Sequence, residues 1–172
     1  EREHVVESAV REGELFAMPA ANLLEEREER RATIKARCEM ASSILSGPGA
    51  AVAWCHLNAE ADAMAEMIPG AVQISGADSD ERKEEVFNAF RHGQVEKLVT
   101  KPKIAAYGLN WQHCNRMTFF ADHSFEQYYQ SVRRLWRFGQ KRDVTVDVIT
   151  TDSLRGVTKN LRRKADATEE MF

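Results

Sequence analysis

The apolar residues of this chain form short runs that alternate with longer amphipathic stretches. Runs of strand length occupy residues 51–57, 71–75, 97–100, 116–121 and 144–150. Segments with helical spacing follow at residues 58–68, 79–92, 124–138 and 153–170. Because helices between consecutive strands make right-handed crossovers, this order predicts a mainly parallel sheet covered on both faces. The predicted fold is therefore an α/β three-layer sandwich.

The first 48 residues differ from the rest in their pattern, which is helical without the short apolar runs. Residues 22–45 are charged, alanine-rich and nearly free of helix breakers, which predicts one long helix ended by Gly47-Pro48-Gly49. A weaker helical segment is expected at residues 7–18, stopped near Pro19. We therefore divide the chain into a helical extension or interdomain insertion at residues 1–48 and a domain at residues 49–172.

Composition narrows the class of protein. The chain has 172 residues, 43% hydrophobic and 30% charged, which suits one compact domain. No apolar run approaches the roughly 20 residues that span a bilayer, so we expect a cytoplasmic protein without a membrane partner. Cys38, Cys55 and Cys114 lack C-x-x-C spacing and are interpreted as reduced thiols, and no metal site is expected. A start at Glu1 instead of Met suggests a piece of a longer protein.

The charge is unevenly distributed around a net value of −3. Basic residues gather at 97–103, 133–142 and 155–164, and the densest group lies in QSVRRLWRFGQ, residues 130–140. On a helix, Gln130, Arg134 and Arg137 are spaced i, i+4 and i+7 and share one face. Guanidinium groups suit polyanionic oxygens because they stay charged and donate in a planar fork. The segment predicts a phosphate-facing arginine pair, with a solvated basic face as the alternative.

The same segment has the pattern Q-x-x-x-R-x-x-R-x-G-Q. This pattern resembles motif VI of superfamily 2 helicases, most closely the remodelling ATPases of the switch/sucrose-nonfermenting type and related phage helicases. The fixed positions are all present: Gln130, Arg134, Arg137, Gly139 and Gln140. The resemblance covers roughly residues 50–152. It implies the second RecA-like domain of such a motor, from a bacterium or a phage-infected host cell.

Three further segments support the resemblance. Residues 51–68 look like motif IV, residues 74–90 look like the strand, loop and helix that follow it, and residues 100–112 resemble motif V with its G-x-N ending at Gly108 and Asn110. Motif V departs from the remodelling pattern, since Lys101-Pro102-Lys103 and Ala105-Ala106 replace Ser-Thr-Arg and paired glycines. Trp111 and Asp122 fit structural roles better than binding roles.

The resemblance assigns roles to individual residues. Arg137 and Arg134 would be catalytic arginine fingers, with Arg137 the first choice. The implied ATP-binding residues are Gln130, Arg134, Arg137, Gly108 and Asn110. The implied nucleic-acid-binding residues are Ser75, Gly76, Lys101, Lys103 and His56. For His56 and Ser75, ordinary packing and turn-capping roles are the alternatives.

Half of an ATPase site is not in this sequence. There is no G-x-x-x-x-G-K-[ST] loop to cradle phosphates and no acidic strand end to hold magnesium. ATP and Mg²⁺ would be bound mainly by an N-terminal RecA-like domain of the same polypeptide. We therefore predict the C-terminal motor domain of an ATP-dependent DNA helicase or translocase, inactive alone, with RNA also possible as substrate. The alternative is a non-catalytic RecA-like module that binds nucleic acid or protein.

Overall fold

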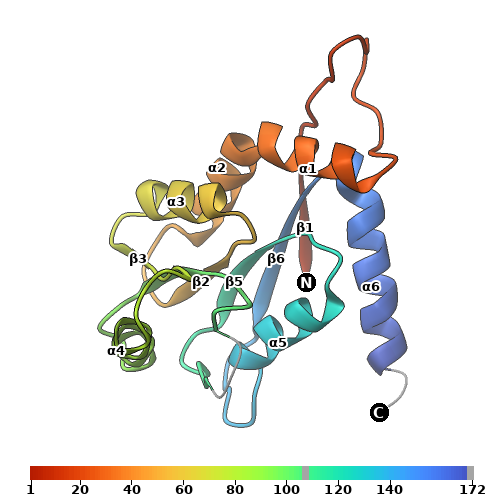
Figure 1. Ribbon diagram of the computed structural model, residues 1–172. Coiled ribbons are helices and arrows are strands. Elements are labelled where there is room, and N and C mark those ends of the chain that lie inside the picture. The colour runs from red at the N-terminus through yellow and green to blue at the C-terminus, as the bar shows by residue number, and fades with distance from the viewer. Residues whose placement is uncertain (106–108, 170–172) are drawn as a thin grey trace.

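The sheet is six-stranded and parallel throughout. The computed structural model describes residues 1–105 and 109–169. The strands are ordered β1-β6-β5-β2-β4-β3 across the sheet (Figure 1). Their bounds are β1 Arg2–Val6, β2 Ala51–Trp54, β3 Ala71–Gln73, β4 Lys97–Thr100, β5 Arg116–Phe120 and β6 Thr145–Thr151.

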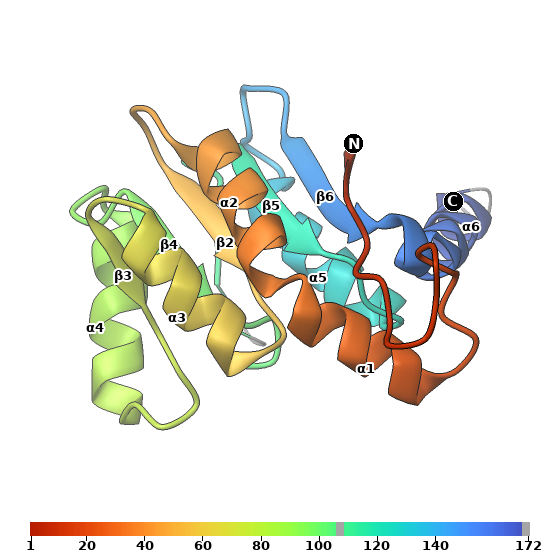
Figure 2. The ribbon, with the colours of Figure 1, turned by 90° about the horizontal axis from the view of Figure 1, so that it is seen from above.

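Helices cover both faces of this sheet. Their bounds are α1 Leu23–Ala32, α2 Ile34–Leu45, α3 Asn58–Met67, α4 Asp80–Arg91, α5 Phe125–Leu135 and α6 Arg155–Glu169, with a 3₁₀ turn at Asp152–Leu154. Figure 2 shows α2 and α3 on one side of the sheet and α5 on the other. Along β2, Val52 and Trp54 belong to the core with α4, α5 and α6, whereas Ala51 and Ala53 belong to the core with α2 and α3. This alternation is the two-residue period of a strand buried on both faces. The predicted three-layer α/β sandwich is confirmed.

The strand β1 was not predicted from the sequence. It pairs in parallel with β6 and forms one edge of the sheet. Only Val6 of this strand is buried, so the segment gives almost no hydrophobic signal. His4 helps to hold it, because its Nε2 lies 2.7 Å from a carboxylate oxygen of Asp147, a buried residue of β6.

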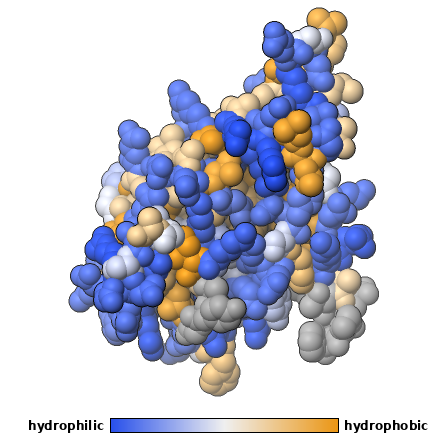
Figure 3. Space-filling view, in the orientation of Figure 1, coloured by the Kyte–Doolittle hydropathy of each residue, from blue (hydrophilic) through white to orange (hydrophobic). Residues whose placement is uncertain are grey.

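The helix predicted at residues 7–18 is wrong. That segment is irregular and projects from the body of the protein (Figure 1). Leu15 and Phe16 are 88% and 76% exposed, and Figure 3 shows apolar side chains on this projection. A short helix is marginal in water unless one face packs against the protein, and these exposed side chains provide no such face.

The helix predicted at residues 22–45 is divided in two. The break falls at Thr33, whose hydroxyl donates to the Glu29 carbonyl at 2.7 Å and accepts from the Arg37 Nε at 3.0 Å. A threonine bonded back onto its own helix commonly bends it. The bend lets α2 pack on the sheet while α1 continues toward the start of α6.

A buried ion pair joins the N-terminal helices to the rest of the fold. Arg37 of α2 and Glu60 of α3 are 2% and 1% exposed, with 2.6 Å between Nη1 and Oε1. The second oxygen of Glu60 accepts the backbone N–H groups of His56 and Leu57 at 2.9 and 3.0 Å, which caps α3. The Arg37 guanidinium also lies 4.9 Å from the centre of the Phe120 ring. Residues 1–48 thus supply an edge strand and part of the core.

Candidate functional site

Helix α5 carries the arginine segment along the sheet. It begins after Ser124, whose hydroxyl accepts the Gln127 N–H at 3.3 Å. Its inner face buries Tyr128, Ser131 and Leu135. The helix ends at Leu135, so the expectation that it continues to residue 138 is wrong, and Arg137 lies in the turn that follows.

Arg134 and Arg137 nevertheless come together. Each donates an Nη1–H to the carbonyl oxygen of Leu109, at 3.3 Å from Arg134 and 3.2 Å from Arg137. Burial lowers the pKa of Arg134, and the nearby charge of Arg137 lowers it further. Two like charges at one carbonyl repel each other, so an anion placed beside both would relieve that repulsion.

These arginines line a cleft of about 730 Å³ along α5, which we call the basic cleft. Among the described residues, it is lined by four cationic side chains, Lys103, Arg133, Arg134 and Arg137, and by one carboxylate, Glu126. Gln130 also lines it. Three predicted ATP-binding residues and one predicted nucleic-acid-binding residue therefore share one concave surface, whose donors fit a polyphosphate.

The turn after α5 is held by the other two residues of the motif. Gly139 has a φ of +95°, and a Cβ there would lie 2.9 Å from the Gln112 side-chain oxygen. The Gln140 amide donates to the carbonyls of Cys114 and Leu135 at 3.0 and 3.1 Å. Gly139 and Gln140 thus dock the turn that presents Arg137 onto the loop before β5.

Of the two remaining ATP-binding predictions, Asn110 falls on that loop. Gly108 lies outside the described residues. Asn110 folds back locally, since its Oδ1 accepts the Gln112 N–H at 3.3 Å. It follows Leu109 directly but does not line the basic cleft. Trp111 is fully buried and stacks on Trp54 with ring centres 5.8 Å apart, which is the structural role expected for it.

The predicted nucleic-acid residues other than Lys103 lie along the carboxyl edge of the sheet. The Ser75 N–H and hydroxyl both donate to one Asp78 oxygen, at 2.7 and 3.0 Å. That backbone hydrogen bond lowers the pKa of Asp78. Gly76 is exposed, and the Lys101 ammonium donates to the Asn58 side chain at 2.5 Å. The amide and hydroxyl of Ser75 are thus already used by a carboxylate.

His56 is enclosed at the end of β2. Its side chain is 12% exposed, its Nε2 donates to the Phe120 carbonyl at 2.9 Å, and its Nδ1 lies 3.3 Å from an Asp122 oxygen. Burial lowers the pKa of His56, and Asp122 opposes that shift. Asp122 also pairs with Arg30 of α1 at 3.2 Å, so these polar groups act within the protein.

Arg133 was not predicted as a site residue. It lines the basic cleft and stacks on two aromatic rings of the same segment, Tyr129 and Trp136. The signal in the sequence was the spacing of these three residues at i, i+4 and i+7, next to the face that carries Gln130 and Arg134.

The described part of the chain contains neither a cluster of metal ligands nor a membrane-spanning helix. Within residues 1–105 and 109–169, no three His, Cys, Asp or Glu side chains are grouped so that they could hold a metal ion. In the same residues, none of the helices combines the length and apolarity needed to cross a bilayer.

Comparison with solved structures places the fold. The C-terminal part of the Fun30 ATPase domain is 15% identical, with a TM-score of 0.60 over 75% of this chain and 44% of that chain. The C-terminal domain of the DEAD-box protein Dbp5 is 11% identical, with a TM-score of 0.61 over 74% and 77%. Escherichia coli DEAD-box protein SrmB, bound to regulator of ribonuclease activity A, is 16% identical, with a TM-score of 0.63 over 76% and 79%.

At these identities the likeness concerns the fold alone, which is that of RecA-like helicase C-terminal domains. The chain spans less than half of the matched Fun30 chain. No curated protein sequence matches it. A family model, the helicase conserved C-terminal domain, matches residues 37–139, which is more than half of the chain and includes the basic-cleft arginines. The chain therefore belongs to the helicase conserved C-terminal domain family.

Proposed function

We propose that this domain is the C-terminal motor domain of an ATP-dependent DNA helicase or translocase. In this proposal Arg134 and Arg137 complete an ATPase site whose phosphate-binding loop lies in a preceding RecA-like domain of the same polypeptide. The observation that carries it is the meeting of both guanidinium groups at the Leu109 carbonyl, inside a cleft with four cations and one carboxylate.

The chemistry of the cleft suits the phosphates of ATP. Arginine donors keep their charge at any working pH and bind phosphate oxygens in a fixed geometry. When the two domains close, Arg137 and Arg134 would exchange the Leu109 carbonyl for phosphate oxygens and stabilise the charge that develops as the terminal phosphoryl group leaves. An arginine in this role is worth about 10³- to 10⁵-fold in rate.

The other members of the site have supporting roles in the proposal. Gln130 would contact the nucleotide from the same wall of the cleft, and Asn110 would do so from the loop that carries Leu109. Gly108 is proposed as a further contact from its place in the motif. A cleft with one carboxylate fits phosphates better than a divalent cation, so Mg²⁺ is assigned to the facing domain. This domain alone is expected to be inactive.

The nucleic-acid grip is proposed at the carboxyl edge of the sheet. Lys101 at this edge, and Lys103 from the basic cleft, would contact the backbone of DNA, or of RNA, without reading bases. Ser75 and Gly76 would offer backbone amides, but a phosphate would have to displace the Asp78 carboxylate from Ser75. His56 would contribute through the shape of this edge, because its ring nitrogens face Phe120 and Asp122.

The decisive variant is Arg137→Ala in the full-length protein. ATP turnover with saturating nucleic acid should fall by about 10³-fold or more. The ATP turnover of Arg137→Lys should also fall sharply, because a lysine keeps the charge but not the planar fork of donors. Arg91→Ala, an exposed arginine at the end of α4, is the matched control and should turn over normally.

Circular dichroism should show the same fold for all three variants. Single-stranded DNA, duplex DNA and RNA, tested in parallel as stimulators, would identify the substrate. Unchanged turnover in Arg137→Ala would refute the proposal and favour the non-catalytic RecA-like module.

A further inference from the structure

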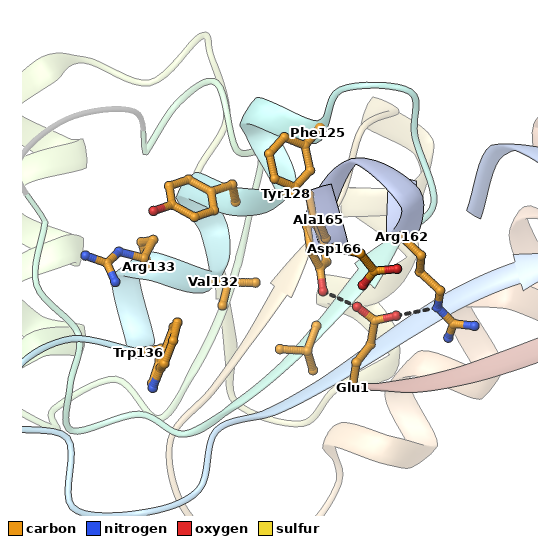
Figure 4. Close-up of a pocket in the computed structure, with 11 residues that line it drawn as sticks. Glu1, Phe125, Tyr128, Val132, Arg133, Trp136, Arg162, Ala165 and Asp166 are labelled. Carbon is orange, nitrogen blue, oxygen red and sulfur yellow. Dashed lines mark hydrogen bonds and ion pairs between the residues drawn. The ribbon is translucent and has the colours of Figure 1, made fainter. Parts of the chain in front are cut away.

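A second and larger hollow lies on the other side of α5, between α5 and α6. Its volume is about 1090 Å³. Figure 4 shows Arg133 of α5 and Trp136, the residue after α5, at one side, and Arg162 and Asp166 of α6 at the other. Tyr129 and Arg133 line both this hollow and the basic cleft, so they form the ridge between the two.

Arg133 of this ridge stacks on Tyr129 and also on Trp136, which lines the larger hollow. The Arg133 guanidinium lies 5.9 Å from the Tyr129 ring centre and 5.7 Å from the Trp136 ring centre. Tyr129 is 37% exposed and Trp136 is 55% exposed. We call this set the Tyr129–Arg133–Trp136 ladder. Large aromatic side chains exposed beside a cavity commonly mark a binding surface.

The chemistry of the ladder matches a planar ligand. Every nucleobase presents a π-face, and tyrosine, tryptophan and arginine are among the side chains that stack on such faces. The ladder adjoins a cleft whose donors fit phosphates, and a nucleotide joins a base to phosphates covalently. One ligand could therefore place its phosphates at Arg134 and Arg137 and its base on the ladder.

A solvated helix face and an apolar contact with a facing domain account less well for the exposed rings. A solvated face would not need two aromatic rings with a cation held between them. A purely apolar contact would account for Trp136 but not for Arg133, which would lose its hydration there.

We propose that the Tyr129–Arg133–Trp136 ladder binds a nucleobase by stacking. The inference rests on the proposed function, because the basic cleft must hold the phosphates of the same ligand. The base can come from ATP or from the nucleic-acid strand, and ATP is favoured because the cleft and the ladder share Tyr129 and Arg133.

The test uses Trp136→Ala in the full-length protein, measured by steady-state ATP hydrolysis. Loss of a base–aromatic stack should raise the KM for ATP by about 5- to 150-fold with little change in kcat. Inhibition by inorganic tripolyphosphate, which has no base, should be unchanged. Trp136→Phe should recover most of the affinity. Phe138→Ala is the matched control, because Phe138 is fully exposed beside Arg137 but lines neither cavity.

A second measurement separates the two sources of the base. The concentration of single-stranded DNA that gives half-maximal stimulation is compared with that of an abasic strand. If the strand supplies the base, Trp136→Ala should raise the half-maximal concentration of the normal strand and leave that of the abasic strand unchanged. The KM for ATP should then stay constant.

Several outcomes overturn the inference. It fails if Trp136→Ala and Tyr129→Ala change neither the KM for ATP nor the half-maximal concentration of single-stranded DNA by more than about twofold. It also fails if inhibition by tripolyphosphate weakens by as large a factor as the KM for ATP rises. It also fails if Phe138→Ala reproduces the whole effect. The proposed function is judged separately, by the ATP turnover of Arg137→Ala, and normal turnover in this variant refutes it. If Arg137→Ala loses turnover but Trp136→Ala keeps normal constants for ATP and for the strand, only the base-binding role of the ladder is refuted.

Discussion

Some polar residues that the sequence suggests as contacts for a ligand instead bind other groups within the protein. His56 ends a buried strand, which made it a candidate for contacting nucleic acid. In the structure its ring lies between the Phe120 carbonyl and Asp122 and meets the edge of the Phe119 ring, with ring centres 5.1 Å apart. The distances that decide such a role cross the sheet, so no local pattern could supply them.

The enclosure of His56 predicts a pH dependence of stability. Burial lowers its pKa below the usual value of about 6.5, with Asp122 and Glu60 opposing and Arg30 assisting. As the pH falls through that usual value, the unfolded chain therefore binds this proton before the folded protein does. The free energy of unfolding should decrease from about pH 7 to about pH 5.

Urea denaturation of His56→Gln, which keeps an N–H for the Phe120 carbonyl, should show a weaker decrease. His113, whose pKa is also lowered chiefly by burial, should leave a residual slope of the same sign. The exposed His92→Gln variant serves as control. Equal slopes in the wild-type protein and His56→Gln would contradict this account.

Among the elements, the central strands and the edge strand β3 were predictable, whereas the edge strand β1 and the end of α5 were not. The strands β2, β4 and β5 are continuous apolar runs because helices cover both of their faces, and their predicted positions are confirmed. The edge strand β1 buries one face sparsely and went undetected. The end of α5 was also misplaced in the prediction. The turn that follows it packs against the loop before β5, at the Gln112 side chain and the Cys114 carbonyl, and these contacts are not visible in a local pattern.

The turn after α5 can be tested with Gly139→Ala. The left-handed φ of +95° costs a residue with a Cβ about 1–2 kcal/mol, and the new Cβ would press on Gln112. We expect lower stability and a larger loss of ATP turnover in the full-length protein, because Arg137 would be displaced. Gly156→Ala, at a helical position with open space around it, is the control. Equal turnover in both variants would show that the turn does not position Arg137.

In the whole molecule, the N-terminal residues form part of the sheet and of the core, which their charged composition does not indicate. The domain boundary at residue 48 stays a prediction, but residues on both sides of it contribute to the same sheet and the same core. The strand β1 extends the sheet, and α2 contributes Cys38, Ala41 and Leu45 to the core shared with α3. The most deeply buried ion pair between the N-terminal residues and the rest of the described structure is Arg37–Glu60.

Arg37→Met should destabilise the protein by about 3–5 kcal/mol, since it leaves the Glu60 carboxylate buried without its partner. Lys35→Met is the matched control on the same helix, because the Lys35–Glu39 pair is exposed and worth at most about 0.5 kcal/mol. Denaturant unfolding measures both. A small effect of Arg37→Met would mean that residues 1–48 are only loosely coupled to the core.

The sequence alone determined the α/β architecture, the order of the buried elements and the arginine motif. It could do so because apolar periodicity and motif spacing are local properties of the chain. Tertiary structure decided which candidates share a surface: Lys103, Gln130, Arg134 and Arg137 line one cleft, whereas Ser75 and His56 are engaged by Asp78 and Asp122. It also revealed the edge strand and the ladder, because pairing across a sheet and stacking beside a cavity depend on distances that a linear pattern does not contain.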